Sequence, residues 1–125
     1  MIYLDTHVVV WLYAGELERF PARACELIEG NELLISPIVL LELQYLREIG
    51  RLLVEPGVLF ENLATTIQLA LCDHPFAKII SESLIQTWTR DPFDRIITAQ
   101  ARVSDCYLLT KDAVILNNYT KAVWD

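Results

Sequence analysis

The chain has 125 residues, of which 54% are hydrophobic and 22% are charged, and its formal net charge is −7. This length and apolar content predict one folded domain, residues 1–125, and exclude a disordered chain. The longest uninterrupted apolar run, residues 8–14, is far too short for a membrane span. The N-terminal region also lacks the pattern of a secretory signal, so we expect a cytoplasmic protein with no membrane partner.

The first expected elements lie near the N-terminus. An apolar segment at 2–4 predicts a short buried strand, and the run at 7–13 follows it. The β-branched residues of that run also suit a strand. We expect a helix, because Asp5 and Thr6 suit a helix start and Gly15 suits its end.

The remaining apolar segments continue this alternation of strands and helices. They predict strands at 33–36, 68–72, 107–110 and 122–124. They predict helices over 21–29, 37–49, 58–66, 75–87, 92–104 and 113–117. Such alternation predicts an α/β fold with a mainly parallel sheet. Ligands of these folds bind beyond the carboxyl ends of the strands, where Asp5 and Asp112 fall.

The net negative charge argues against a general nucleic-acid-binding surface, since phosphate contacts need Lys and Arg, but it does not exclude a nucleic-acid enzyme. The cysteines, Cys25, Cys72 and Cys106, are far apart and odd in number. We therefore expect buried free thiols and neither disulfides nor a zinc site. His7 and His74 stand alone and are weak candidates for catalysis.

Glu42 interrupts an apolar face of the helix expected over 37–49. The apolar residues that share this face are Ile38, Leu41, Tyr45, Leu46 and Ile49. We expect the face to be buried, and an unpaired buried carboxylate is strongly unfavourable unless it takes up a proton or has a function. A salt bridge to a nearby Arg is the structural alternative.

Asp91, Asp94 and Asp112 each have a structural alternative to a functional role. Asp91 precedes Pro92, which suits the first position of a helix, so Asp91 suits the N-cap. Asp94 shares a helix face with apolar residues, so we expect it to point inward. Asp112 either caps the short helix after it or joins the other acids, and Asp5 has the same two interpretations.

Several carboxylates brought close together predict a site for a divalent cation, because Mg²⁺ and Mn²⁺ prefer oxygen ligands and relieve the repulsion between the acids. The chemistry that such a site favours is metal-assisted, in-line hydrolysis of a phosphodiester. Arg90, Arg95 and Lys111 flank the acids and are candidates to hold substrate phosphates, although each also suits a solvated surface position.

Four segments together resemble the motifs of PIN-domain ribonucleases, especially the VapC-type toxins of bacterial toxin–antitoxin pairs. They are Leu4-Asp5-Thr6-His7 with Trp11-Leu12, Ile35-Ser36-Pro37 with Glu42, Asp91-Pro92-Phe93-Asp94-Arg95-Ile96-Ile97 with Ala99-Gln100-Ala101, and Leu108-Leu109-Thr110-Lys111-Asp112. The resemblance implies a three-layer α/β/α sandwich with a central, mainly parallel sheet. It also implies Mg²⁺- or Mn²⁺-dependent endoribonuclease activity on RNA, homodimerisation and inhibition by a cognate antitoxin.

The resemblance carries site roles over to matching positions. It assigns the catalytic and metal-binding roles to Asp5, Glu42, Asp94 and Asp112, and supporting roles to Thr6, Asp91 and Thr110. The chain departs from the pattern at Val39 and Leu41, where family members often carry a serine and a tryptophan, and segment 50–75 matches no motif.

Three other functions fit parts of the pattern. A receiver-like signalling domain would use Asp73 as phosphoacceptor with Thr110 and Lys111 downstream, but such domains need paired acids after the first strand, where Thr6 follows Asp5. A non-catalytic interaction protein with the PIN fold is a second alternative. A metal-dependent phosphatase is the third alternative, but this chain lacks the second Asp that such enzymes usually carry two residues after the first.

Overall fold

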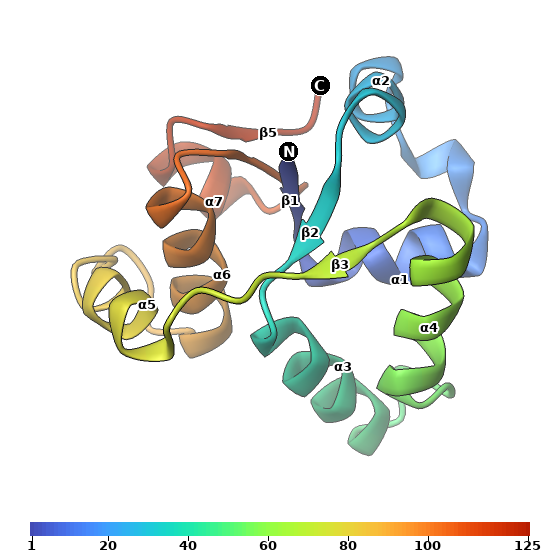
Figure 1. The fold of residues 1–125 in the computed structure, drawn as a ribbon, viewed down its shortest axis with the longest axis horizontal. Helices are drawn as coiled ribbons and strands as arrows, with labels where there is room; N and C mark the ends of the chain where they lie inside the picture. The colour runs from blue at the N-terminus through green and yellow to red at the C-terminus, as the bar shows by residue number, and fades with distance from the viewer.

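The computed structural model describes residues 1–125 and has a central five-stranded sheet with helices on both faces (Figure 1). The strand order is β3-β2-β1-β4-β5, and every neighbouring pair is parallel. The strands are β1 (Ile2–Leu4), β2 (Leu33–Ile35), β3 (Ala70–Leu71), β4 (Tyr107–Leu109) and β5 (Ala122–Val123). The predicted α/β fold with a parallel sheet is therefore confirmed.

The helices form the two outer layers. They are α1 (Thr6–Ala14), α2 (Ala22–Gly30), α3 (Ile38–Glu48), α4 (Pro56–Ile67), α5 (Phe76–Ser83), α6 (Pro92–Val103) and α7 (Ala113–Asn118), with a 3-10 turn η1 (Leu17–Arg19). In Figure 1, α1, α2 and α4 lie on one side of the sheet and α5, α6 and α7 on the other. Helix α3 lies beyond the carboxyl ends of the strands and packs against α1, α4 and α6. None of these helices has both the length and the apolar character needed to cross a membrane.

The order of the strands creates a crevice beside β1. The chain runs outward from β1 to β3 and then returns to β4, on the other side of β1. Right-handed connections place the helices before and after this reversal on opposite faces of the sheet. The loops that leave β1 and β4 therefore diverge, which is the arrangement that forms ligand sites in open α/β sheets.

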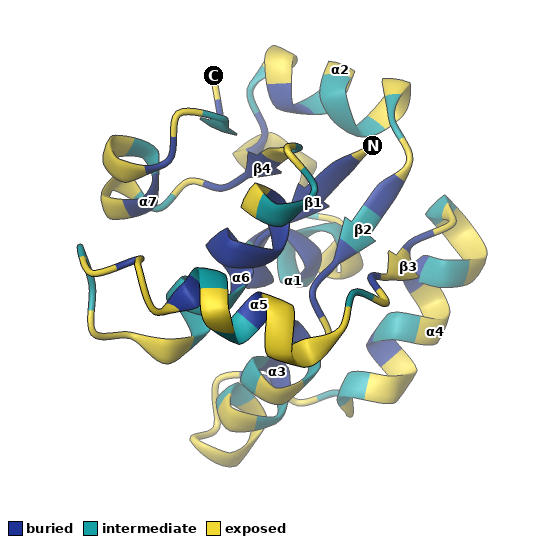
Figure 2. Cartoon of the chain, turned by 60° about the vertical axis from the view of Figure 1, so that its left-hand side comes forward, coloured by how far each residue is buried: buried dark blue, intermediate teal, exposed yellow.

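The hydrophobic core surrounds the central strands. All three residues of β1 are buried, and so are Leu108 and Leu109 of β4. Figure 2 shows these strands as the buried centre of the molecule, with exposed residues on the outer sides of the helices, in the loops and at the edge strand β3. Because helices cover both faces of the sheet, its central strands are apolar without alternation.

Local signals account for most of the helix boundaries. Asp5 caps α1, and Gly15 ends it in the left-handed conformation with φ 72°. Gly50 follows α3 with φ 80°. Pro56 and Pro92 each occupy the first turn of a helix, where their missing N–H is not needed.

The prediction for α5 was wrong at its C-terminal end, since the helix ends at Ser83 and not at Thr87. Beyond Ser83, side chains bond to the backbone carbonyls of the α5–α6 loop. Arg90 Nη1 donates to the Thr87 carbonyl at 3.0 Å, and Arg95 Nε donates to the Thr89 carbonyl at 2.8 Å. The backbone bonds just past Ser83 are those of turns, since the N–H of Gln86 donates to the Ser83 carbonyl at 3.1 Å, and the Ser83 hydroxyl competes for the Ile80 carbonyl at 2.7 Å.

The cysteines are free, as predicted, but only Cys72 is buried. Cys25 lies on α2, whose only buried residue is Ala24, and Cys106 precedes β4 at the amino end of the sheet. The expectation of three buried thiols was therefore wrong for Cys25 and Cys106, which pack against the edge of the core and are only partly buried.

Candidate active site

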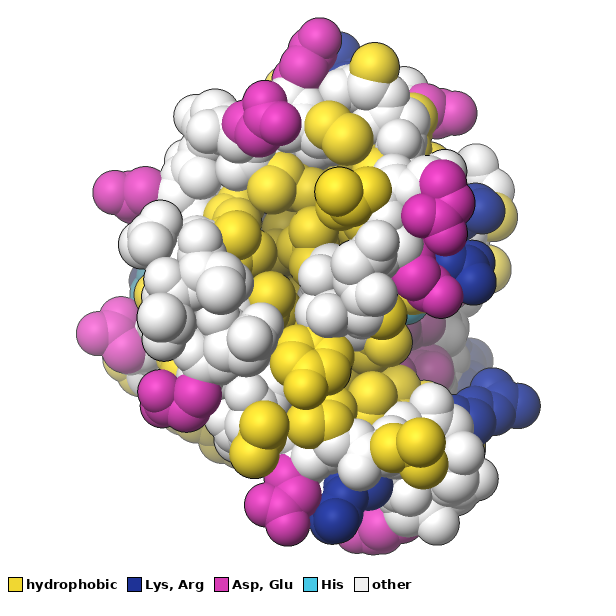
Figure 3. All heavy atoms as spheres, turned by 90° about the vertical axis from the view of Figure 1, so that its right-hand side faces the viewer, with side chains coloured by type: hydrophobic (Ala, Val, Ile, Leu, Met, Phe, Trp, Pro, Cys, Tyr) yellow, Lys and Arg dark blue, Asp and Glu magenta, His cyan; other side chains and the backbone are white.

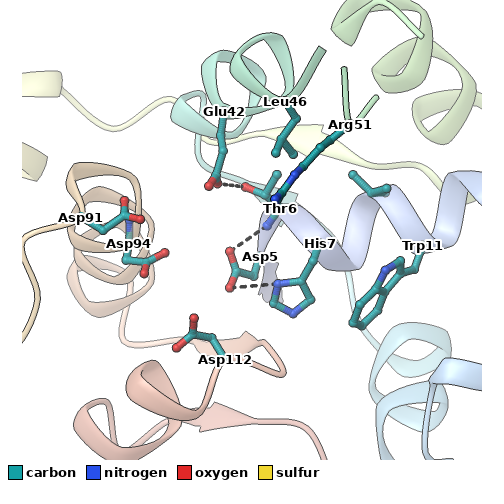
Figure 4. A pocket seen from close by; sticks show the side chains of 11 residues that line it. Asp5, Thr6, His7, Trp11, Glu42, Leu46, Arg51, Asp91, Asp94 and Asp112 are labelled. Carbon is teal, nitrogen blue, oxygen red and sulfur yellow. Dashed lines mark hydrogen bonds and ion pairs between the residues drawn. The ribbon is translucent and has the colours of Figure 1, made fainter. Parts of the chain in front are cut away.

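A cavity of about 430 Å³ opens at the carboxyl edge of the sheet, beside the end of β1 (Figure 4). Eleven residues line it. Five of them are acids, namely Asp5, Glu42, Asp91, Asp94 and Asp112. The other six are Thr6, His7, Val10, Trp11, Leu46 and Arg51. The fold thus brings together all the acids that the sequence analysis selected.

Asp5 is the most firmly held of these acids. Its backbone N–H continues the sheet by donating to the Leu109 carbonyl at 3.0 Å. Its Oδ1 accepts the N–H of Thr6 at 2.8 Å, and its Oδ2 accepts the hydroxyl of Thr110 at 2.7 Å. Asp5 is only 4% exposed. Asp5 caps α1 and also lines the cavity with the other acids.

Glu42 extends from α3 into the cavity and is half-buried. Burial raises the pKa of Glu42 to about 7, the hydrogen bond that Thr6 donates to its Oε1 opposes this rise, and the charges of Asp5 and Asp91 add to it. No Lys or Arg forms an ion pair with Glu42, so the salt bridge considered as an alternative is absent.

The apolar face of α3 that was expected in the core lies largely on the surface. Leu41 is 57% exposed and Tyr45 is 50% exposed, whereas Val39 and Leu43 are fully buried. The Tyr45 ring lies 6.1 Å from the Phe93 ring of α6. Both sides of α3 carry apolar residues, and periodicity alone does not say which side faces the sheet.

Asp91 and Asp94 come from the start of α6. Asp91 Oδ1 accepts the N–H groups of Phe93 and Asp94 at 2.8 and 3.3 Å, so Asp91 is the predicted N-cap. The Asp94 carboxylate forms no ion pair. Burial raises the pKa of Asp94 to about 8, and the negative charges of the other four acids add to the rise.

Asp112 caps α7 and is tied to Asp5 through Thr110. Asp112 Oδ1 accepts the N–H groups of Val114 and Ile115 at 2.8 and 3.0 Å. The N–H of Asp112 donates to Thr110 Oγ1 at 3.0 Å, and the same hydroxyl donates to Asp5. Thr110 is fully buried, so this short network sets the relative positions of the two acids.

His7 has a larger structural role than the sequence indicated. Its Nε2 accepts the N–H of Lys111 at 2.9 Å, which leaves the ring proton on Nδ1, 3.6 Å from Asp5 Oδ2. Burial lowers the pKa of His7, although the charges of Asp5 and Asp112 oppose this effect. The neutral ring therefore joins α1 to the segment before Asp112. The sequence signals at this position were the turn that Asp5 caps and the motif Leu4-Asp5-Thr6-His7.

The cations that the sequence analysis selected lie outside the cavity lining. Arg90 and Arg95 donate to backbone carbonyls of the α5–α6 loop, and Lys111 Nζ lies 5.9 Å from the centre of the Trp11 ring. Arg51 lines the cavity instead. It lies in a segment without any recognised motif, so no local signal identified it.

The set of oxygen donors suits a hard divalent cation. The cavity contains five carboxylates, two of them with raised pKa values, and a bound cation would relieve their repulsion. No three of these side chains stand close enough in this structure to form a ready-made cluster of ligands. Cation binding would therefore require side-chain rotation, to which Asp94 is suited because it has no ion pair to break.

A family model for the PIN domain matches residues 2–121. The chain belongs to the PIN domain family. Among curated proteins, none matches the chain significantly. Membership confirms the family predicted from the four sequence motifs.

Three solved structures have a fold similar to this PIN domain. VapBC-1 from nontypeable Haemophilus influenzae has a TM-score of 0.67 and 20% identity, covering 100% of this chain and 97% of that chain. A toxin–antitoxin complex from Klebsiella pneumoniae has a TM-score of 0.64 and 18% identity, covering 98% and 96%. VapBC2 from Rickettsia felis, bound to a promoter DNA fragment, has a TM-score of 0.61 and 20% identity and covers both chains fully.

The PIN domain assignment does not support a receiver-like function. Asp73, the phosphoacceptor of that alternative, is exposed, follows the edge strand β3 and does not line the acidic cavity. Thr110 and Lys111 lie on the opposite side of β1 from Asp73. The groups that a receiver would need are therefore divided between two parts of the sheet.

Proposed function

We propose that this PIN domain, residues 1–125, is a Mg²⁺- or Mn²⁺-dependent endoribonuclease that acts in the cytoplasm as the toxin of a VapBC-type pair. The observation that carries the proposal is the cavity shared by five acids, none of which is paired with Lys or Arg. Such a cluster is electrostatically unfavourable, as the raised pKa values of Glu42 and Asp94 indicate. Strongly perturbed carboxylates in a cleft are typical of functional sites.

Each residue of the cluster has a distinct part in this proposal. The four acids that we propose as cation ligands are Asp5, Glu42, Asp94 and Asp112. A bound cation supplies activation of water near neutral pH and stabilisation of the leaving oxygen. Thr110 orients Asp5 and Thr6 orients Glu42, in each case through a hydroxyl donor. Asp91 holds the start of α6 in place and adds negative charge beside Asp94.

The test is cleavage of single-stranded RNA by the purified protein. Internal cleavage should require Mg²⁺ or Mn²⁺ and should stop when EDTA is added. Asp94→Asn should lower the rate by more than about 100-fold, since losing groups that only orient a metal ligand already costs about 10- to 100-fold. Asp73→Asn is the matched control, because Asp73 is exposed and lies outside the cavity.

Two results would contradict the assignment. Wild-type rates in both Glu42→Gln and Asp94→Asn would show that the acids are not the catalytic site. Failure of the unaltered protein to cleave any RNA with either metal would favour the non-catalytic interaction protein.

We further propose that a cognate antitoxin covers an apolar face beside α1 and α4. The residues that line this face are Val10, Tyr13, Ala14, Leu52, Leu53 and Val54. Figure 3 shows hydrophobic side chains gathered in a hollow on this side of the molecule, with charged residues around the rim. Leu53 is 94% exposed, which is unfavourable for a large apolar side chain without a partner. The Klebsiella pneumoniae relative was solved as a toxin–antitoxin complex.

Leu53→Glu should prevent co-purification of the protein encoded beside this chain and leave RNA cleavage unchanged. Val114→Glu, which alters an exposed residue of α7, is the control and should retain the partner. Equal recovery of the partner with both variants would place the antitoxin elsewhere.

We also propose that the exposed apolar side of α3 is the homodimer face. Tyr45 of α3 lies beside Phe93 of α6 on this surface, and Leu41 is exposed one helical turn before Tyr45. Burial of such residues against a second copy would remove a substantial apolar area from water. Leu41→Glu should convert a dimer to a monomer in sedimentation equilibrium, and an unchanged mass would contradict this assignment.

A further inference from the structure

One basic side chain enters the acidic cavity. Arg51 is the only Lys or Arg among the eleven lining residues. In Figure 4 it extends inward from the loop after α3, on the side away from Asp91, Asp94 and Asp112. The cavity therefore has acids on one wall and a guanidinium group on another.

The backbone after α3 directs Arg51 towards the cavity. Gly50 adopts φ 80°, and its N–H donates to the Arg47 carbonyl at 3.1 Å. The N–H of Arg51 then donates to the Leu46 carbonyl at 2.8 Å. This pair of bonds ends the helix and reverses the chain over its last turn. Arg51 is thereby placed beside Leu46, which lies one helical turn after Glu42 and also lines the cavity.

The Arg51 guanidinium is free of protein partners. Five ion pairs occur in the structure and Arg51 belongs to none of them. Arg47, at the end of the same helix, pairs with Glu55 at 3.7 Å. Arg51 makes no such pair although five carboxylates line the same cavity, so it is not committed as their counter-ion.

We propose that Arg51 binds a phosphate of the RNA strand next to the bond that is cleaved, an inference that rests on the proposed nuclease function. A chain with net charge −7 needs a local cation to hold a polyanion beside an acid cluster. A guanidinium group binds phosphate through two parallel N–H bonds, which fixes the position of the strand as well as attracting it. Arg51 is exposed and unpaired, so it makes this contact without first losing another.

RNA binding, measured separately from cleavage, tests this role. The probe is a short, mixed-sequence, fluorescein-labelled single-stranded RNA, and anisotropy is recorded over a range of salt concentrations. The measurements use Asp94→Asn protein, in which cleavage of the probe should be more than about 100-fold slower. Adding Arg51→Ala should weaken binding about tenfold, as expected for loss of one charge-assisted contact. It should also reduce the slope of log affinity against log salt by about 0.7, the value for one phosphate contact on a single strand.

Two further variants separate a phosphate contact from a general effect of charge. Arg47→Ala removes the same charge from the same helix end but outside the cavity, and it should leave the salt slope unchanged. Arg51→Lys keeps the charge but not the paired donors, so it should keep the slope and recover only part of the affinity. Thermal melts of each variant identify any that fail to fold.

Equal affinity and slope for Arg51→Ala and Arg47→Ala would overturn the proposal. A gain in thermal stability or cation affinity with unchanged RNA binding would also overturn it and assign Arg51 an electrostatic role towards the acids. Absence of both RNA binding and cleavage in the unaltered protein would remove the proposed function and this inference with it. If the unaltered protein cleaves RNA and Arg51→Ala binds RNA normally, the inference about Arg51 is wrong and the proposed function stands.

Discussion

The Thr110 hydroxyl donates a hydrogen bond to Asp5 Oδ2 at 2.7 Å and so joins the carboxyl ends of β4 and β1. The two strands are neighbours in register, with Leu4 opposite Leu109. A residue just after one strand therefore orients an acid just after the other. The position of Asp5 in the cavity depends on this contact between residues that are distant in the sequence.

Replacing Thr110 with Val should destabilise the protein and impair the site. Valine keeps the shape but removes the hydroxyl, which leaves Asp5 Oδ2 and the N–H of Asp112 without their shared partner. The cost in unfolding free energy should be about 1 to 3 kcal/mol in urea denaturation. Thr120→Val, at an exposed turn position, is the control and should change stability little. Equal unfolding midpoints for the two variants would show that the network is unimportant.

The stability of the metal-free protein should fall as pH rises from about 4 to 8, in part because of Asp94. The pKa of Asp94 is raised from 3.8 to about 8 in the folded state, so the folded protein holds this proton more tightly than the unfolded chain. The resulting stabilisation is complete below the unfolded pKa and is lost as pH rises through the folded pKa.

Asp94→Asn removes this dependence. From acid to alkaline pH, the free energy of unfolding of Asp94→Asn should rise by about 1 to 2 kcal/mol relative to that of wild type. This range is reduced for solvent screening, because Asp94 is half-exposed. Urea denaturation at a series of pH values in EDTA measures the difference. The plot of unfolding free energy against pH for Asp73→Asn should run parallel to that of wild type. A parallel plot for Asp94→Asn would show that burial does not raise the pKa of Asp94.

Mg²⁺ or Mn²⁺ should stabilise the folded protein by about 2.7 kcal/mol at a hundredfold excess over the dissociation constant. Affinity should increase from pH 6 to 8, because the cation requires Glu42 and Asp94 without their protons. Thermal melts with increasing metal measure both effects. Melts that do not move with millimolar metal would contradict a cation site, and a full response in Asp94→Asn would exclude Asp94 as a ligand.

His7→Ala should weaken cation binding by up to about tenfold, in the range found for groups that orient metal ligands. The substitution removes the acceptor for the Lys111 N–H and frees the segment that leads to Asp112. His7→Gln offers a replacement acceptor and should recover part of the loss. Metal-dependent melting at pH 7 compares the variants, and an unchanged response in His7→Ala would assign His7 to packing alone.

The element boundaries were largely predictable because they depend on local bonds. Asp91 and Asp112 accept N–H groups two and three residues ahead, and Gly15 ends α1 with a left-handed residue. The C-terminal end of α5 was not predictable, because the backbone past Ser83 forms turns and the side chains of Arg90 and Arg95 bond to carbonyls of the following loop, where no periodic pattern exists.

The site was predictable only in part. Strand-end position indicated Asp5 and Asp112, position on an apolar helix face indicated Glu42 and Asp94, and the motifs included all four. The apolar side of α3 that carries Glu42 is nevertheless not its core side, because Leu41 and Tyr45 lie at the surface and Val39 and Leu43 in the core. Helical spacing shows which residues share a side but not what that side contacts.

Local residue patterns were enough to predict the order of the strands and helices, which acids stand at their ends and which family the chain resembles. These properties depend on residue type and on hydrogen bonds within about one helical turn. The folded arrangement was needed to show that Thr6 reaches Glu42, that Thr110 reaches Asp5 and that Arg51 enters the cavity. Those contacts join distant parts of the chain, and their geometry is set by the packing of all layers around the core at once.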